Sequence, residues 1–130
     1  MRIRSAVAVF VIAFAAAACA PVPIMNVEDA PVATASGKAL SKSDVRSAIL
    51  RAGTGLGWVM KDEDPNTLLG TLNLRTHSAV VEIPYSTRAY SIKYRSSVDL
   101  DAADGKIHKN YNGWIQNLQR SINANLSAAS

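Results

Sequence analysis

At 130 residues, of which 48% are hydrophobic, the chain is long enough for one small domain and no more. Its formal net charge of +4 includes Arg2 and Arg4 at the extreme N-terminus, so the basic balance does not indicate a nucleic-acid partner. Cys19 is the only cysteine, which excludes a disulfide within the chain and leaves the hydrophobic core to stabilise the domain.

The first predicted element is an export signal. An alanine-rich apolar run covers residues 6–18, and Arg2 and Arg4 precede it. A positive start, a short apolar stretch and small residues at a cleavage point are the parts of such a signal. The sequence Ala16-Ala17-Ala18-Cys19 resembles the lipobox of bacterial lipoproteins, in which the cysteine thiol is acylated before the signal is removed.

This resemblance implies that residues 1–18 are a signal peptide and that Cys19 becomes a lipidated N-terminus. The family usually has leucine where this chain has Ala16. One alternative is ordinary signal cleavage, because the same alanines fit the small-x-small pattern. Another is a retained membrane helix, although the apolar stretch is shorter than the roughly 20 residues that span a bilayer.

The residue after the cysteine predicts the destination. In the lipoproteins that the lipobox resembles, aspartate at this position retains the protein at the inner membrane. Ala20 therefore implies transport to the outer membrane, with the protein facing the periplasm. Lipidation supplies more than one acyl chain, so we expect a stable anchor.

Residues 19–40 are predicted to be the lipidated N-terminus and a flexible tether. The segment is rich in Pro, Ala, Val, Thr and Ser, shows little periodicity and contains three prolines. A flexible chain of this length has an end-to-end distance of about 25 Å. The alternative is an edge strand formed by Ile24, Met25 and Val27.

The first regular element of the predicted domain, residues 41–127, is a helix. Ser41 and Asp44 have the spacing of an N-terminal cap, and apolar residues then recur at helical spacing from about Ser43 to Ala52. Gly53 is expected to end this helix in the left-handed conformation.

Three segments alternate apolar and polar residues, as half-buried antiparallel strands do. They cover residues 68–75, 78–85 and 90–95. A shorter strand near 58–61 is expected before them, with a turn at Asp64-Pro65-Asn66.

A two-residue turn at Thr76-His77 would place Leu74 opposite Ala79 in the first hairpin. This register keeps the apolar positions on one side, whereas a slip by one residue would turn them to solvent.

In the second hairpin, a four-residue loop over residues 86–89 would place Tyr85 opposite Tyr90. The same register puts Glu82 opposite Lys93 on the polar face, which is a favourable cross-strand pair. The two hairpins together predict an antiparallel meander with one apolar face.

A second amphipathic helix of about four turns is predicted near the C-terminus. Asn110 is the preferred cap and His108 the alternative. Residues 128–130 are expected to be a tail. The apolar side chains that recur at a spacing of three and four are Tyr111, Ile115, Leu118, Ile122 and Leu126.

These elements predict an α+β domain: a helix, a three- or four-stranded antiparallel meander and a C-terminal helix, with both helices on one sheet face. The segment from about Gly57 to Leu126 also resembles small uncharacterised lipoproteins of Gram-negative bacteria, which implies a fold but no established activity. The motifs that carry this resemblance are Arg75-x-His77-x-Ala79-x-Val81-x-Ile83-x-Tyr85, Tyr90-Ser91-Ile92-x-Tyr94 and Ile107-His108-x-x-Tyr111-Asn112-x-Trp114-Ile115.

Neither a metal site, a cofactor nor a catalytic centre is expected. The motif Asp99-x-Asp101-x-x-Asp104-Gly105 is rich in oxygen ligands, but it departs from the EF-hand spacing and has no closing glutamate, so a solvated turn is expected. His77 and His108 are the only histidines, too few for zinc without other ligands. No serine lies in a recognisable nucleophile motif.

The expected role is therefore that of a non-enzymatic accessory or protein-interaction module of the cell envelope. Its candidate interaction face is the polar side of the sheet, represented by Arg75, His77, Lys93 and Arg95. The partners expected are the membrane, through the lipid, and an envelope protein. The alternative is a domain that binds a small ligand or a cell-wall polymer, which exposure of aromatic residues such as Trp58 or Tyr90 would favour.

Overall fold

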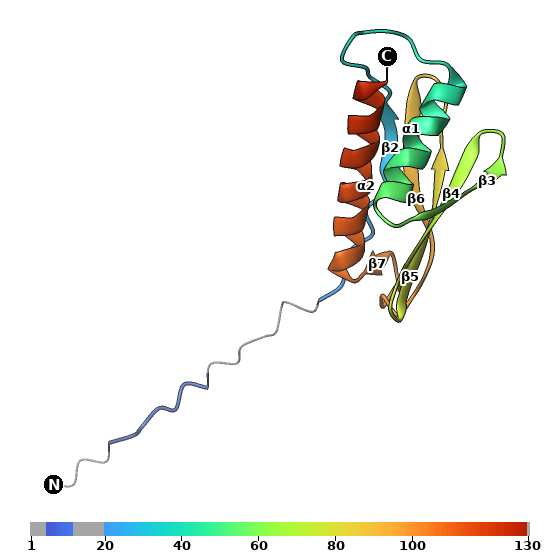
Figure 1. The fold of residues 1–130 in the computed structure, drawn as a ribbon. Coiled ribbons are helices and arrows are strands. Elements are labelled where there is room, and N and C mark those ends of the chain that lie inside the picture. Colours follow the sequence, from blue (N-terminus) through green and yellow to red (C-terminus); the bar gives the residue numbers. More distant parts are fainter. Residues whose placement is uncertain (1–4, 12–19, 130) are drawn as a thin grey trace.

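A five-stranded antiparallel sheet and two helices make up the computed structural model, which describes residues 5–11 and 20–129 (Figure 1). The helices α1 (Lys42–Gly55) and α2 (Lys109–Ala128) pack against each other and cover the same face of the sheet. A separate two-stranded pairing joins β1 (Val22–Pro23) to β7 (Lys106–Ile107). The order of strands in the large sheet is β2 (Val27–Pro31), β6 (Ala89–Val98), β5 (His77–Pro84), β4 (Thr67–Leu74) and β3 (Val59–Asp64).

The α+β class and the helix–meander–helix order are confirmed, but the sheet has one strand more than expected. Within the described part of the chain, no helix is both long and apolar enough to cross a bilayer. Near the C-terminus, α2 extends to Ala128, and Ala129 packs against the core. The predicted tail of residues 128–130 is therefore too long.

The additional strand, β2, corrects the prediction of a flexible tether. Val27 pairs with Ile92 and Ala30 pairs with Tyr90, with a bulge at Asp29 between the two pairs. Both Val27 and Ala30 are buried, whereas the residues between them are exposed. The alternative of an edge strand formed by Ile24, Met25 and Val27 is correct only for Val27, because Ile24 and Met25 lie outside β2. Pro31, the last residue of β2, is tolerated because an edge strand needs backbone donors on one side only.

The predicted cap of α1 is confirmed. The Asp44 amide donates to the Ser41 hydroxyl over 3.1 Å, and the Ser41 amide donates to the Asp44 carboxylate over 3.1 Å. This reciprocal pair is a capping box. Hydrogen bonding from Ser41 lowers the pKa of the Asp44 carboxyl.

The predicted end of α1 is wrong by about one turn, because Gly53 is a buried residue of the helix. Gly57, with φ of 88°, takes the left-handed conformation instead. The Gly57 amide donates to the Thr54 carbonyl over 3.1 Å, and the Trp58 amide donates to the Gly53 carbonyl over 2.9 Å. These two bonds form a Schellman motif, which turns the chain into β3.

The β4–β5 register differs from the prediction by two residues. Leu74 pairs with His77 and Leu72 pairs with Ala79, so the turn consists of Arg75 and Thr76. Arg75 has φ of 55°, a left-handed conformation at the first turn position. A shift of two preserves the alternation of strand side chains, and the apolar residues therefore still face the helices.

The β5–β6 register is as predicted, since Glu82 pairs with Lys93 and Tyr85 lies opposite Tyr90. Beyond Lys93 the pairing changes: Val81 opposes Tyr94 and Val80 opposes Ser96. Arg95 is the extra residue of this bulge. The predicted turn after β3 is also correct, because Asp64 pairs with Thr67 across Pro65 and Asn66.

The core lies between the two helices and the apolar face of the sheet. The amphipathic pattern of α2 is confirmed, but its cap is His108, whose Nδ1 accepts from the Asn110 amide over 3.1 Å, rather than Asn110 itself. Its buried residues are Tyr111, Ile115, Leu118, Ile122 and Leu126, and those of the central strands include Leu68, Leu72, Ala79, Val81, Ile83 and Ile92.

Tyr111, in the first turn of α2, is a buried polar residue. Its ring meets the Tyr94 ring edge to face, with centroids 5.5 Å apart and an interplanar angle of 85°. Among the described residues, its hydroxyl has no hydrogen-bond partner. Burial raises the pKa of this phenol, so the group is neutral and its desolvation is not compensated by a protein partner.

We expect Tyr111→Phe to raise the free energy of unfolding by about 1 kcal/mol, because an unsatisfied buried hydroxyl costs about 1–3 kcal/mol. Urea unfolding measured by tryptophan fluorescence tests this. The matched control is Tyr90→Phe, because the Tyr90 hydroxyl donates to Asn123 Oδ1 over 2.6 Å, and its loss is expected to destabilise the fold by about 1 kcal/mol. Equal destabilisation by both variants would show that the Tyr111 hydroxyl is hydrogen-bonded in solution.

Candidate functional site

The candidate site is the side of the sheet that the helices leave uncovered, which we call the open face. Its residues alternate along each strand with those of the core. Their side chains are exposed or half-buried, apart from that of Ser91. They include Glu28, Val59, Lys61, Thr67, Leu69, Thr71, Asn73, Ser78, Val80, Glu82, Pro84, Ser91, Lys93, Arg95, Ser96 and Val98.

Charged residues form a continuous band across the open face. Arg95 Nη1 lies 2.5 Å from Glu63 Oε1 and 3.5 Å from Glu82 Oε1. Lys93 Nζ lies 3.9 Å from Glu28 Oε2. The hydrogen bond to Glu63 raises the pKa of the Arg95 guanidinium. These five residues, the charged band, alternate in sign and include one more acid than base.

Two of the four predicted interaction residues therefore lie together, but not as a basic patch. Lys93 and Arg95 both belong to the charged band, where acids from three other strands or their bulges neutralise them. Glu63 was not part of the prediction. Its contact depends on the bulge at this residue in β3, for which strand alternation contains no signal.

The other two predicted residues lie elsewhere. Arg75 is in the β4–β5 turn, and His77 is the first residue of β5. His77 Nδ1 is 2.7 Å from the Asp99 carbonyl oxygen, which joins this hairpin to the loop after β6. His77 and Glu82 are five residues apart in β5, which corresponds to about 17 Å at ~3.4 Å per residue. Because Lys93 pairs with Glu82, His77 lies about that far along the sheet from Lys93.

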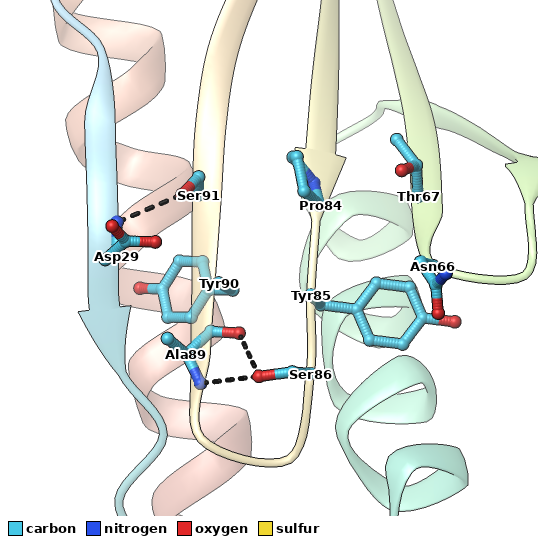
Figure 2. A pocket seen from close by; sticks show the side chains of 9 residues that line it. All are labelled: Asp29, Asn66, Thr67, Pro84, Tyr85, Ser86, Ala89, Tyr90 and Ser91. Atoms are coloured by element: carbon cyan, nitrogen blue, oxygen red, sulfur yellow. Dashed lines mark hydrogen bonds between the residues drawn. The ribbon is translucent and has the colours of Figure 1, made fainter.

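A polar hollow of about 250 Å³ lies beyond the charged band, where the open face meets the β5–β6 hairpin (Figure 2). The Ser91 hydroxyl accepts from the Asp29 amide over 3.0 Å, and the Ser86 hydroxyl accepts from the Ala89 amide over 3.2 Å. Ligand pockets usually have volumes of about 300–1,000 Å³. The hollow therefore suits one polar group or side chain of a larger partner. Its lining comprises Asp29, Asn66, Thr67, Pro84, Tyr85, Ser86, Ala89, Tyr90 and Ser91.

On the helix side, an apolar hollow of about 120 Å³ lies between the end of α1 and the middle of α2. Half-buried Trp114 contributes to its wall. Trp58 and Tyr90 are only 3% and 1% exposed, so the aromatic exposure that would favour the polymer-binding alternative is absent at these two residues. The lining of this hollow comprises Leu56, Trp58, Leu72, Leu74, Trp114 and Asn117.

A third hollow, of about 350 Å³, lies between α2 and the segment that follows β2. Small side chains and amides line it, including Gln119 and Asn123. Asn123 accepts the hydrogen bond of the Tyr90 hydroxyl, whose pKa burial raises to about 12. This lining contains no side chain that titrates near neutral pH, so it has no group suited to acid–base catalysis.

The aspartate-rich loop forms a turn. Asp99, Asp101 and Asp104 each have a left-handed backbone, with φ of 56°, 54° and 53°. Ala103 and Lys106 pair across the loop. Over residues 5–11 and 20–129, no three His, Cys, Asp or Glu side chains are grouped as metal ligands would be.

Cys19, the predicted lipidation site, lies outside the described residues. Comparisons with protein-family models, curated proteins and solved structures gave no match to this chain.

Proposed function

We propose that this protein is a non-enzymatic lipoprotein of the bacterial outer membrane that binds an envelope protein through its open face. Acylated Cys19 would hold it on the periplasmic side of the membrane. The observation that carries the binding role is a charged band of alternating sign beside exposed and half-buried aliphatic side chains, on the sheet face that α1 and α2 leave uncovered.

The aliphatic part of this surface is a row across three strands. Val59 opposes Thr71, which in turn opposes Val80. Val59 is 63% exposed, and Val80 and Leu69 are half-buried. An apolar centre bordered by polar groups is the usual composition of a protein contact surface. Small-molecule sites are instead concave.

The β3 edge of the sheet is less suited to binding a partner by strand addition. β3 ends in Lys61, Asp62, Glu63 and Asp64, and it has a bulge near Glu63. Charges and bulges on an edge strand oppose pairing with a further strand. Arg46 also holds Asp62 with two hydrogen bonds of 3.0 and 2.7 Å, which ties this edge to α1. The open face rather than the β3 edge is therefore the proposed contact.

Lipidation is tested first. We expect labelled palmitate to be incorporated into the native protein and to be absent from Cys19→Ala, with the variant recovered in the soluble periplasmic fraction. The acyl chains supply the proposed anchor, so their loss removes membrane attachment. Cys19→Ser is the matched control, because it replaces the thiol by a hydroxyl of similar size and removes the sulfur that is acylated. Label persisting in either variant would contradict the assignment.

The binding face is tested by crosslinking in the native envelope. A photoreactive amino acid at Val80 is expected to yield a specific protein adduct, whereas the same group at Gln116, on the exposed side of α2, is not. Lys93→Glu is expected to lower the Val80 adduct several-fold, because it reverses a charge in the band. Arg120→Glu, the same kind of reversal on α2, is the control. Equal adducts from Val80 and Gln116, or an adduct indifferent to Lys93→Glu, would contradict the proposal.

A further inference from the structure

The chain joins the fold immediately after the predicted lipidation site. Val22 pairs with Ile107, so β1 is attached to β7 directly before α2. The Ile24 amide donates to the Gly105 carbonyl over 2.9 Å. The first described residues after position 19 that form regular structure are therefore bound to the folded domain.

Asn112, in the first turn of α2, strengthens this attachment. Its Nδ2 donates to the Pro23 carbonyl over 2.9 Å, and its Oδ1 accepts from the Met25 amide over 3.0 Å. One side chain thus satisfies backbone groups on both sides of Ile24, which itself packs against the core. Such a paired contact holds the segment in one position on the helix.

This attachment shortens the distance between anchor and domain. Three residue steps separate Cys19 from Val22, and they span at most about 11 Å when fully extended. The flexible tether expected from the sequence would have given a distance of about 25 Å. A headgroup layer is itself about 5–8 Å thick, so the point of attachment lies within or next to it.

We infer that one end of the domain rests on the headgroup surface of the bilayer, an orientation set by the short connection to lipidated Cys19. This inference rests on the proposed function, because it needs the lipid anchor. We call this the membrane end. It consists of β7, residues 99–105, the first turn of α2 and the β4–β5 turn, which the contact of His77 with Asp99 holds beside the loop (Figure 1).

The opposite end points into the periplasm. Figure 1 shows the chain entering beside β7, and the C-terminus of α2 and the loop before α1 at the other end of the domain. A helix of 20 residues is about 30 Å long, so this far end stands roughly that distance from the membrane. The Tyr90–Asn123 hydrogen bond places the polar hollow beside the C-terminal half of α2. The hollow is therefore presented away from the lipid.

Electrostatic attraction is not what selects this orientation. Acids and bases occur in equal number among the charged side chains of the membrane end. They are Asp99, Asp101, Asp104, Arg75, Lys106 and Lys109. A surface without net charge gains little from anionic lipids. We therefore expect the orientation to persist when salt screens surface charges.

The test measures the distance of two positions from the bilayer in the full lipidated protein. Ala102→Cys places a fluorophore at the membrane end, and Ser36→Cys places it at the far end; both positions are exposed. Acylated Cys19 leaves the introduced cysteine as the only free thiol. The protein is placed in phosphatidylcholine vesicles with nitroxide on some headgroups. Quenching is expected to be several-fold stronger at position 102 than at 36, in roughly 0.1 M and in 0.5 M salt.

Two further variants identify the cause. About ten glycine and serine residues inserted between Ala20 and Pro21 add a reach of about 18 Å and are expected to lower quenching at position 102 several-fold. Asn112→Ala is expected to lower it as well, because the attached segment is released. Asn117→Ala, on the same helix, is the matched control, because the Asn117 side chain accepts a hydrogen bond from Arg120 instead.

The outcomes separate the two proposals. The mass of the purified protein reports the acyl chains independently of the fluorescence. Equal quenching at positions 102 and 36 in a protein that carries the acyl mass would overturn the orientation and leave the lipid anchor intact. A protein without acyl mass would overturn both. Quenching that is strong at position 102 but unchanged by the linker insertion would also overturn the inference, because the short connection would not be its cause.

Discussion

Ile115→Ala is expected to lower the free energy of unfolding by about 2–5 kcal/mol. Ile115 is completely buried in the middle of α2, where it packs against the apolar face of the sheet. Removing three of its carbons loses their transfer free energy and leaves a cavity. Domains of this size are stable by about 5–15 kcal/mol, so the change is a large fraction of the total.

Urea unfolding, followed by the fluorescence of Trp58 and Trp114, measures this effect. Gln116→Ala is the matched control, because Gln116 is the next residue of the same helix and is exposed. We expect it to change stability by less than about 0.5 kcal/mol. A cost below about 1 kcal/mol for Ile115→Ala would mean that α2 does not cover the sheet as described.

Gly70→Val is expected to destabilise the domain by about 1–3 kcal/mol through overpacking. Gly70 lies in β4 on the face covered by the helices, and it opposes Met60 and Val81 in the neighbouring strands. A β-carbon there would lie 3.2 Å from Trp58 Cε3 and 3.3 Å from Val81 Cγ2. The buried indole therefore occupies the space that a side chain at position 70 would need.

A graded series checks this interpretation. Gly70→Ala is expected to cost less than Gly70→Val, because one carbon requires shifts of only a few tenths of an ångström. Gly113→Ala is the control of opposite sign. A β-carbon at Gly113 meets nothing within 4 Å, and the substitution is expected to stabilise α2 by about 0.5–1 kcal/mol. A gain in stability from Gly70→Val would disprove the close packing of Trp58 on this strand.

The features that the sequence predicts correctly depend on residues close together in the chain. The capping box needs Ser41 and Asp44, three positions apart. The apolar stripe of α2 repeats every three or four residues, and the second hairpin closes over the four residues between Tyr85 and Tyr90. Each of these patterns is contained within a few consecutive residues, so it does not depend on contacts with distant parts of the chain.

The errors in the fold have the opposite origin. The predicted β4–β5 register is wrong by two residues, because a shift of two leaves the alternation of apolar and polar side chains unchanged. Arg75 takes the left-handed conformation that sets this turn, but arginine is not a residue type that predicts such a conformation. The strand β2 was missed because the three prolines of residues 19–40 indicate an irregular chain. Its pairing with β6 joins Val27 to Ile92, which lie far apart in sequence.

The candidate site was predicted only in part for the same reason. Strand alternation places Lys93 and Glu82 side by side on the polar face, and the structure has them there. Two bulges then bring Arg95 and Glu63 into contact, so the predicted polar face carries a band of alternating charge. A bulge adds one residue to a strand and changes the side to which the following residues point.

By itself, the sequence determined most of α1, α2 and the strands β3 to β6 and which of their sides is apolar, and it predicts an export signal before Cys19. Helical and strand periodicity, together with short capping and turn motifs, carry that information locally. Only the tertiary structure decided that residues 22–31 belong to the domain, which charges neutralise one another, and how closely the domain follows the predicted anchor. These properties depend on pairings such as Val22 with Ile107, in which the burial of distant residues outweighs the local preference of a proline-rich segment for an irregular chain.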